Sequence, residues 1–296
     1  MKKLISNFTV ILTFSAILLA SCEKKTVPQT ARKEAPSPAD VTSPVENTQT
    51  DTSSPVETAQ PQPATYGKKP RPDSAGDIVF ADGTATAWHE GLSLSEEQKQ
   101  AAVAVIFYDG EAKLLGVGLA HNRDGLALWT TEANAYNENI TTLKFEEVKD
   151  CDGIFLIGDS DGSENLAKIR AYLLELGKDD DTADSEKYPA FHYVKNYASD
   201  ERSRVYGTPF ADGWYLPTIA ELSYLWKNHE SVTAASSLCG GDGFDEFGEG
   251  IYWSSSLFDN VRLAYVFVFK NGDWDYTHVS GFNKMCTLAI RDFTMK

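Results

Sequence analysis

A short acidic loop at 158–165, GDSDGSEN, carries residues suited to hold a cation. Asp159, Asp161 and Glu164 supply carboxylate oxygens, the type of ligand that calcium prefers. The twelve-residue spacing of an EF-hand loop is missing, and Asp and Ser in front of a helix also serve as ordinary caps. Calcium binding is therefore one hypothesis for this loop, and helix capping is the other.

A second acidic loop, GGDGFDEFGEG at 240–250, places carboxylates between glycines. Its candidate metal ligands are Asp242, Asp245 and Glu246. The same composition is typical of a surface loop, so a cation site and a plain loop are both open interpretations. The five histidines do not cluster with the cysteines at metal-ligand spacing, and no zinc site is expected. Calcium is the one cofactor under consideration.

Aromatic side chains alternate along the segment RLAYVFVFKNGDWDYTHV. Asn271-Gly272 between two alternating runs is a strong signal for a hairpin with a two-residue turn. That turn predicts a ladder of cross-strand aromatic pairs on one face: Phe269 with Trp274, Phe267 with Tyr276, and Tyr265 with His278.

The predicted ladder can belong to the core or contact a ligand. We expect Phe267 and Phe269 to pack in the core. The second strand alternates aromatic and acidic residues, and an aromatic face can stack on a sugar or a peptide. Its candidate ligand-binding residues are Trp274, Tyr276, His278, Asp273 and Asp275.

No pattern in the chain predicts catalysis. Ser254, Ser255 and Ser256 form a serine run, but no G-x-S-x-G elbow surrounds it and no His–acid pair is readable nearby. No phosphate-cradling loop and no carboxylate pair suited to general acid and base roles stands out. We therefore expect a protein that is not an enzyme and has no catalytic residues.

The N-terminal segment predicts a lipoprotein signal. Lys2 and Lys3 precede an apolar run at 8–20 that is too short to span a bilayer comfortably. The run ends in LASC, which fits the bacterial lipobox of Leu, two small residues and Cys. Residues 1–21 are the expected signal peptide, with Cys22 as the lipidated first residue of the mature chain. An ordinary secreted protein with a cysteine there by chance is the alternative.

Residues 22–76 are expected to form a disordered tether, because Pro, Thr, Ser, Gln, Glu and Ala dominate and one tyrosine is the only aromatic residue. A coil of this length spans roughly 40 Å. Residues 77–296 then form a single domain. The formal net charge of the chain is −16, which repels nucleic acid and anionic lipid, so no nucleic-acid partner is expected.

Cysteine usage agrees with export. The chain has Cys22, Cys151, Cys239 and Cys286. With Cys22 lipidated, one disulfide and one free thiol is the simplest arrangement in an exported protein. The preferred disulfide joins Cys239 and Cys286.

Turn and cap signals place several elements. Asp82-Gly83 and Asp109-Gly110 each join two β runs. Ser163 is expected to cap a helix that ends at Gly177, and another helix covers about 190–197. The part of the chain after residue 250 is rich in strands.

The stretch DGWYLPTIAEL predicts a structural corner. Pro217 fixes φ in front of Thr218, and Thr218 forms a capping box with Glu221 at the start of a helix. Trp214 and Leu216 are expected to pack beneath it. Each part has a structural explanation, so the stretch marks a fold and not the mouth of an active site.

These motifs resemble a bacterial domain family known from the C-terminal domain of a collagen-like adhesin. GWYLPTIAEL is similar to its W-R-L-P-T-x-x-E-L pattern, YWSSS to its Y-W-S-S pattern, and Arg291 ends the last strand as in its V-R. The likeness is strongest over 150–296 and loose over 77–150. The fold-motif residues that it marks are Trp214, Leu216, Pro217, Thr218, Glu221 and Trp253.

A similar W-R-L-P-T corner occurs in formylglycine-generating enzymes and in variable proteins of diversity-generating retroelements. The resemblance implies an α+β, C-type-lectin-like domain: a twisted antiparallel sheet with two or three helices, behind the tether. Tyr215 stands where the pattern has arginine. The G-N-V-W-E-W signature of the sulfatase-activating enzymes and the Glu-Pro-Asn tripeptide of calcium lectins do not occur, so neither activity carries over.

Together, these features predict a membrane-anchored surface lipoprotein that displays a lectin-like ligand-binding module, as an adhesin or receptor does. Its expected partners are a lipid bilayer, through the Cys22 lipid, and an unidentified protein or glycan. The outer membrane or cell surface is favoured over the periplasmic face. The alternatives are a retroelement-diversified binder of the same fold and, less favoured, a relative of the formylglycine-generating enzymes.

Overall fold

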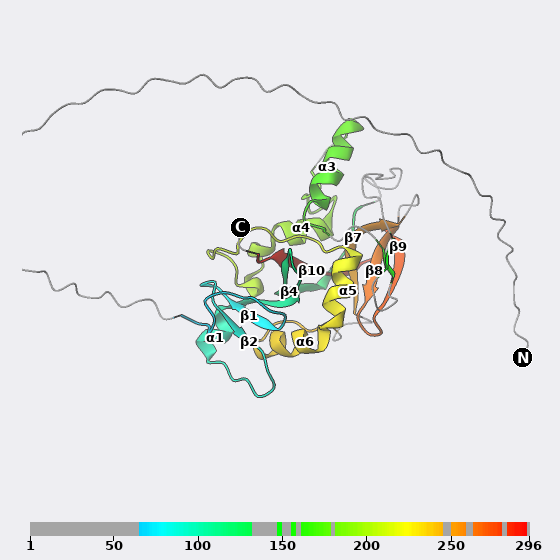
Figure 1. The fold of residues 1–296 in the computed structure, drawn as a ribbon. Helices are drawn as coiled ribbons and strands as arrows, with labels where there is room; N and C mark the ends of the chain where they lie inside the picture. Colours follow the sequence, from blue (N-terminus) through cyan, green and yellow to red (C-terminus); the bar gives the residue numbers. More distant parts are fainter. Residues whose placement is uncertain are drawn as a thin grey trace, which may run out of the picture. The chain divides into compact units, whose positions relative to one another are not determined.

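The computed structural model describes residues 65–131, 147–149, 155–157, 161–178, 181–244, 250–258, 263–279 and 283–294. In these residues the chain is an α+β protein with a mostly antiparallel sheet and few helices (Figure 1), which confirms the predicted class. The predicted signal peptide, Cys22, Cys151 and most of the predicted tether lie outside them. No helix within the described ranges has the length and apolar character needed to cross a membrane.

The described residues form the following elements, in chain order: β1 (Asp77–Phe80), β2 (Ala85–Ala87), α1 (Glu96–Ala101), β3 (Ala102–Asp109), β4 (Leu114–Ala127), β5 (Glu147–Lys149), β6 (Phe155–Ile157), α3 (Asn165–Glu175), α4 (Pro189–Lys195), the 3₁₀-helices η1 (Tyr197–Ser199) and η2 (Glu201–Ser203), α5 (Ile219–Lys227), α6 (His229–Leu238), β7 (Ile251–Phe258), β8 (Leu263–Val268), β9 (Asp273–His278) and β10 (Met285–Asp292).

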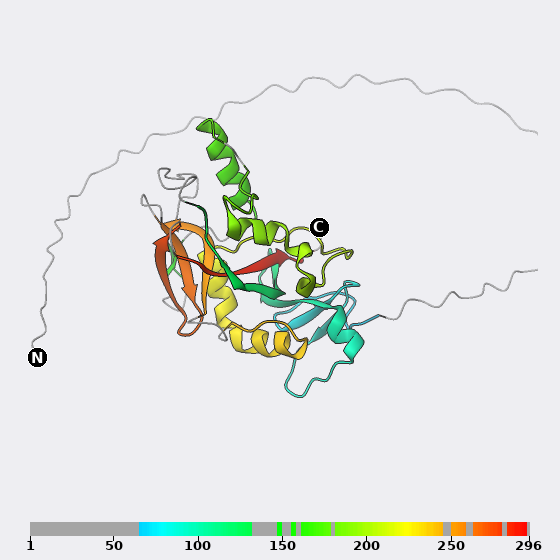
Figure 2. The ribbon, with the colours of Figure 1, turned by 180° about the vertical axis from the view of Figure 1, so that it is seen from behind.

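One sheet, in the order β2-β1-β3-β4-β10-β7-β8-β9, frames the domain. Its neighbouring strands pair antiparallel except β10 and β7, which run parallel and meet at Cys286 and Tyr252. Figure 2 shows red β10 between green β4 and the orange strands. The last strand of the sequence therefore joins the two halves of the sheet.

Helices cover both faces of this sheet (Figures 1 and 2). On one face α4 contributes Phe191 to a core cluster that also holds Ala289 of β10. On the other face α5 and α6 contribute Leu222 and Val232 to a second cluster, which holds Ile290 of β10. Successive residues of a strand point to opposite faces, so β10 serves both cores.

Register shifts interrupt several of the strand pairs, and two of these shifts matter for the regions described below. In β4, four steps from Val117 to His121 oppose only two steps of β10. In β7, four steps from Trp253 to Leu257 oppose two steps of β8. A bulge leaves backbone N–H and C=O groups without a partner in the ladder. Other parts of the chain must supply those partners, and this requirement shapes the two regions described below.

The hairpin at Asn271-Gly272 forms, but the predicted register is wrong by two residues. Val268 pairs with Asp273, so four residues and not two connect β8 to β9. Phe269 leaves this ladder because its N–H donates to the carbonyl of Gly250 at 3.0 Å and its ring is buried. A shift of two residues keeps each side chain on its predicted face. The observed aromatic pairs are Phe267 with Trp274 and Tyr265 with Tyr276.

Two helix starts test the cap predictions. The capping box of α5 is confirmed: Thr218 Oγ1 accepts from the Glu221 N–H, and the Glu221 carboxylate accepts from the Thr218 N–H. The cap predicted at Ser163 is wrong, because Glu164 is the N-cap of α3 and makes no side-chain cap bond. The Ser163 N–H instead donates to Asp161 Oδ1 at 3.0 Å, in a local turn.

Ordered contacts begin before Asp77. Lys69 forms an isolated bridge with Ala85 of β2, and its Nζ lies 2.9 Å from the fully buried carboxylate of Asp77. The carbonyl of Tyr66 accepts from Gln98 of α1. The described residues ahead of Asp77 thus pack against the domain, so the predicted boundary between residues 76 and 77 lies too late.

The predicted disulfide between Cys239 and Cys286 is wrong, because both cysteines are free and buried. Cys239 is the C-cap of α6, and Cys286 lies in β10. Both pack in the core cluster beneath α5 and α6, where a free cysteine behaves as a small apolar residue. Burial raises the pKa of Cys239 to about 11 and also raises that of Cys286, so both thiols stay protonated at neutral pH.

Gly272 and Gly83 form a matched pair for testing the β8–β9 connection. Both have positive φ, +72° and +86°, but a Cβ on Gly272 would lie 2.2 Å from the Trp226 ring, whereas a Cβ on Gly83 would meet open space. We expect Gly83→Ala to lower the free energy of unfolding by about 1 kcal/mol through backbone strain. Gly272→Ala should lower it by about 2–4 kcal/mol, because the ring must also move. Urea unfolding measures both, and equal losses would contradict this packing.

Candidate functional site

Glu221 anchors the corner that the sequence singled out. Its Oε2 accepts from the N–H groups of Thr218 at 2.9 Å and Gly162 at 3.2 Å, and its Oε1 accepts from the Tyr215 hydroxyl at 2.9 Å. The side chain is fully buried, and this desolvation raises the pKa of Glu221 to about 7 despite the hydrogen bonds. Trp214, 5 % exposed, packs beneath. The buried hydrogen bonds of Glu221 therefore hold the corner together as a structural unit.

The YWSSS segment docks on this corner. The Ser255 N–H donates to the Pro217 carbonyl at 2.7 Å, and Ser256 Oγ accepts from the Ile219 N–H at 3.1 Å. Ser255 Oγ accepts from the Asn165 amide at 2.8 Å. These contacts supply partners for the bulge in β7 and for the first turn of α5. The serine hydroxyls are buried and bonded, as the structural interpretation of this run predicts.

Arg291 closes the corner from the opposite side. Its Nη1 donates to the Asp212 carbonyl, and its guanidinium carbon lies 5.3 Å from the ring centroid of Phe210 and 5.7 Å from that of Phe293. These distances suit cation–π contacts. Arg291 follows the bridge that pairs β10 with the corner. The fold-motif residues therefore build one structural unit, and Trp214 and Leu216 of this unit also line a small cavity of about 240 Å³.

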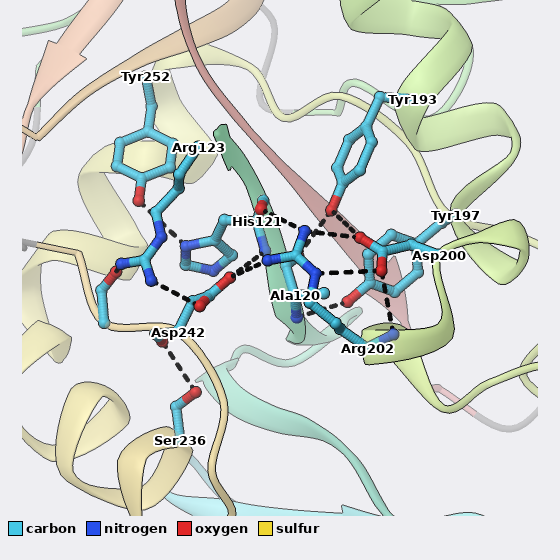
Figure 3. A network of polar contacts seen from close by, with 11 residues as sticks. Ala120, His121, Arg123, Tyr193, Tyr197, Asp200, Arg202, Ser236, Asp242 and Tyr252 are labelled. Carbon is cyan, nitrogen blue, oxygen red and sulfur yellow. Dashed lines mark hydrogen bonds and ion pairs between the residues drawn. The ribbon is translucent and has the colours of Figure 1, made fainter. Parts of the chain in front are cut away.

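A second region forms around the bulge in β4, where Asp242 is the anchor (Figure 3). Its Oδ2 accepts from the His121 N–H at 2.7 Å and its Oδ1 from Arg123 Nη2 at 2.6 Å. The Asp242 N–H donates to the Leu119 carbonyl at 2.8 Å. The side chains of Asp242 and Arg123 are 16 % and 10 % exposed. Because water is largely excluded, this ion pair is stronger than a surface pair.

Two tyrosines bind the next backbone groups of the bulge. The Tyr197 hydroxyl accepts from the Ala120 N–H at 2.9 Å, and the Tyr193 hydroxyl donates to the Ala120 carbonyl at 3.0 Å (Figure 3). Gly118 permits this approach, because a Cβ there would lie 2.2 Å from the Tyr197 hydroxyl oxygen. Burial raises the pKa of both phenols, so they remain neutral hydrogen-bonding groups.

Arg202 links the bulge to Asp200. Its Nη2 donates to Asp200 Oδ2 at 2.8 Å and to the His121 carbonyl at 3.0 Å, and its Nη1 lies 3.3 Å from Asp242 Oδ2 (Figure 3). The guanidinium thus bridges two carboxylates and one bulge carbonyl. Such charge-assisted hydrogen bonds are stronger than neutral ones, and they also fix the relative orientation of the groups. The positive charge of Arg202 therefore balances the negative charge of Asp200.

The His121 side chain is a core group and not an acid–base group. Its Nδ1 lies 3.0 Å from the Tyr252 hydroxyl, and its ring stacks at an angle against Phe244. Burial lowers the pKa of His121 to about 4, so the imidazole is neutral at neutral pH. His121 thus connects the network to the core: its backbone N–H bonds to Asp242, and its buried ring contacts Tyr252.

A cleft of about 370 Å³ lies beside this network, and we call it the β4–α4 cleft. Asn122, directly after the bulge, lines one side of it, and residues of α4, of the loop before α4 and of η1 and its C-terminal end line the rest. The side chains that define the cleft are Asn122, Ser185, His192, Tyr193, Asn196 and Asp200. Amide, hydroxyl, imidazole and carboxylate groups therefore converge on one open cavity.

The predicted ligand-binding strand lies elsewhere. Trp274 is half-buried with its ring 5.5 Å from that of Tyr265, and Tyr276 is 44 % exposed. Asp273 and Asp275 are exposed on edge strand β9. His278 ends β9, and its side chain lies outside the described residues. The other four, whose side chains are described, do not line the β4–α4 cleft.

The predicted metal ligands do not form one site in the described residues. Asp161 pairs with Lys113 at 2.7 Å, and Asp242 pairs with two arginines. Glu164 is the N-cap of α3. Across the described ranges, no group of three or more His, Cys, Asp or Glu residues could hold a metal ion. The remaining candidates fall outside those ranges: Asp159, Asp245 and Glu246.

The sequence did not point to the β4–α4 cleft. Asn122 and Asp200 are far apart in the chain, and the tertiary fold alone brings them to one cavity. One signal was available: Tyr193 and Tyr197 are four residues apart within the helix predicted over about 190–197, a spacing that puts two side chains on one face, although in the structure Tyr193 lies in α4 and Tyr197 in η1. The partner of such a tyrosine in the strand is a glycine, here Gly118, because a Cβ at that position would collide with the Tyr197 hydroxyl.

Comparisons with known proteins add no assignment. No protein-family model matches the chain. A search of curated proteins gives no match.

Glu221→Gln should remove a pH dependence of stability. The folded-state pKa of Glu221 is raised from 4.5 to about 7, so its contribution is fully present below pH 4.5 and is lost as the pH rises through 7. The glutamine carbonyl still accepts from Thr218 and Gly162, and its NH₂ reaches the Tyr215 oxygen without a buried charge. Relative to the variant, the wild type should lose about 3 kcal/mol between pH 4.5 and 8.

The measurement is urea unfolding of both proteins at a series of pH values. The exposed Glu201→Gln is the matched control, and its difference from the wild type should stay flat across the same range. A flat difference for Glu221→Gln as well would show that the buried carboxyl does not titrate as described.

Proposed function

We propose that this chain is a lipid-anchored surface protein whose lectin-like domain binds a ligand in the β4–α4 cleft, as an adhesin or receptor does. The observation that carries the proposal is a cleft lined mainly by polar side chains, some of which make no hydrogen bond within the described part of the protein. Among the described residues, the side chains of Asn122 and Ser185 have no hydrogen-bond partner. Small ligands usually bind in a concave site on which a few polar groups converge.

The lectin-like part of the proposal is supported by how the motifs meet. Arg291 contacts the corner that holds Glu221, and the bulge of YWSSS docks against the same corner. The antiparallel sheet and its few helices agree with a C-type-lectin-like arrangement. The side chains that line the β4–α4 cleft support it as the position of the proposed ligand.

The anchoring part rests on the sequence. The basic start, the apolar run and LASC predict lipidation of Cys22. A lipid of two or more acyl chains holds a protein stably at a bilayer. The Pro- and Thr-rich segment that follows would let the domain reach outward, which favours the outer membrane or cell surface as its location.

Bacterial cells that express the full chain test both halves of this proposal. With the wild type, we expect palmitate label on the chain and capture of intact cells on an array of proteins and glycans. Cys22→Ala should abolish both, because the chain is no longer held at the surface. Ser21→Ala, which keeps a small residue in the lipobox, should behave as the wild type, and cells without the chain give the background.

The two halves fail in different ways. Label on Cys22→Ala, or no label on the wild type, would show that Cys22 is not the lipidated residue. Labelled wild-type cells that no array spot retains above background would show that the domain is not a ligand-binding module.

A further inference from the structure

We propose that the β4–α4 cleft binds a neutral saccharide unit. This inference rests on the proposed function and narrows its ligand class from a protein or glycan to an uncharged sugar. Three properties of the cleft lead to it: the hydrogen-bonding groups left open, the balance of charge, and the shape and stiffness of the walls.

The open groups include both donors and acceptors. The Asn122 side-chain amide, which has no hydrogen-bond partner among the described residues, offers an NH₂ donor and a carbonyl acceptor. The Ser185 side chain offers a hydroxyl. His192 Nδ1 lies 2.6 Å from the Ala183 carbonyl, so Nε2 remains for a ligand. Asn196 Nδ2 donates to the His192 carbonyl at 3.0 Å, which leaves Asn196 Oδ1 as an acceptor. Sugar hydroxyls donate and accept at once, and they match such a mixed set.

The charge in the cleft disfavours ionic ligands. Asp200 is the one acidic residue among the described residues that line it, and Arg202 holds its carboxylate by bonds from Nε at 3.2 Å and Nη2 at 2.8 Å. Among the described lining residues there is no lysine or arginine, and the nearby Arg202 is already engaged by Asp200, so these residues offer an anion no free cationic partner. The chain as a whole carries −16, which repels anionic ligands further.

The shape fits a sugar better than a peptide. A cavity of about 370 Å³ has the scale of small-ligand sites and could take about one or two sugar rings. Pro189 and the Tyr193 ring supply its apolar surface, which suits the C–H face of a sugar. A peptide would instead need an apolar groove or a free strand edge. The described lining residues come from α4, η1, loops and β4, and β4 has no free edge because it lies between β3 and β10 in the sheet.

The walls are held in place before any ligand arrives. Tyr193 is fixed by its bond to Ala120, and Asp200 by Arg202, which also contacts Asp242. Asn122 follows the bulge directly and pairs with Thr287 of β10 through the backbone. A site whose side chains are already ordered loses little conformational entropy on binding. This compensates for the weak net gain of hydrogen bonds between neutral groups.

The purified full chain in detergent is tested on a printed array of neutral oligosaccharides, acidic oligosaccharides and proteins. We expect the wild type to bind a neutral oligosaccharide. Asn122→Ala, which removes an open amide, should weaken binding about tenfold. Ser185→Trp, in an exposed loop, should weaken it at least as much by filling the cleft. The matched control is Ser237→Trp on the exposed side of α6, which should bind within about twofold of the wild type.

Each other outcome overturns the inference. Equal binding of neutral saccharides by the wild type and both cleft variants would place the sugar site elsewhere. Binding of acidic oligosaccharides alone would give the wrong ligand class. Protein ligands alone would overturn the saccharide inference and leave the proposed function standing, whereas no ligand at all would remove both. Ser185→Trp keeps the test decisive should Asn122→Ala unfold.

Discussion

The requirement to satisfy the backbone of the bulged strand β4 organises one side of this protein. Two extra residues in β4 opposite β10 leave N–H and C=O groups that the sheet cannot pair. Asp242 takes the N–H of His121, two tyrosines take both backbone groups of Ala120, and Arg202 takes the carbonyl of His121. The helix α4, the 3₁₀-helices and the loop after α6 are thereby drawn to one place, and the cleft lies beside them.

The bulge in β7 follows the same physical rule with different partners. There the Pro217 carbonyl accepts a hydrogen bond from the N–H of Ser255 in the bulge. The Ser256 hydroxyl in turn accepts from the Ile219 N–H in the first turn of α5. Buried Glu221 joins this corner to the loop at Gly162. Both bulged strands neighbour β10 in the sheet. One bulge is completed by a compact corner that serves the fold, and the other by a polar network that borders an open cavity.

Local features of the fold could be predicted from the sequence, and long-range features could not. The capping box of Thr218 and Glu221 depends on residues three apart, and the structure confirms it. The hairpin register was wrong because Phe269 bonds to Gly250, a partner that no turn rule contains. Asp242 looked like a cation ligand because its arginine partners are distant in sequence. The cysteine count suggested a disulfide, but burial in the core explains both thiols. The cleft was missed for the same reason as the partners of Asp242.

The most direct test of this account is the free energy of unfolding of Asp242→Asn, measured by urea titration against the exposed Asp275→Asn. If the Asp242 carboxylate holds the β4 bulge, its replacement leaves Arg123 and Arg202 without their anion and should lower stability by about 2–4 kcal/mol. Asp275→Asn should stay within about 0.5 kcal/mol of the wild type. Equal stability of the two variants would contradict the central role given to Asp242.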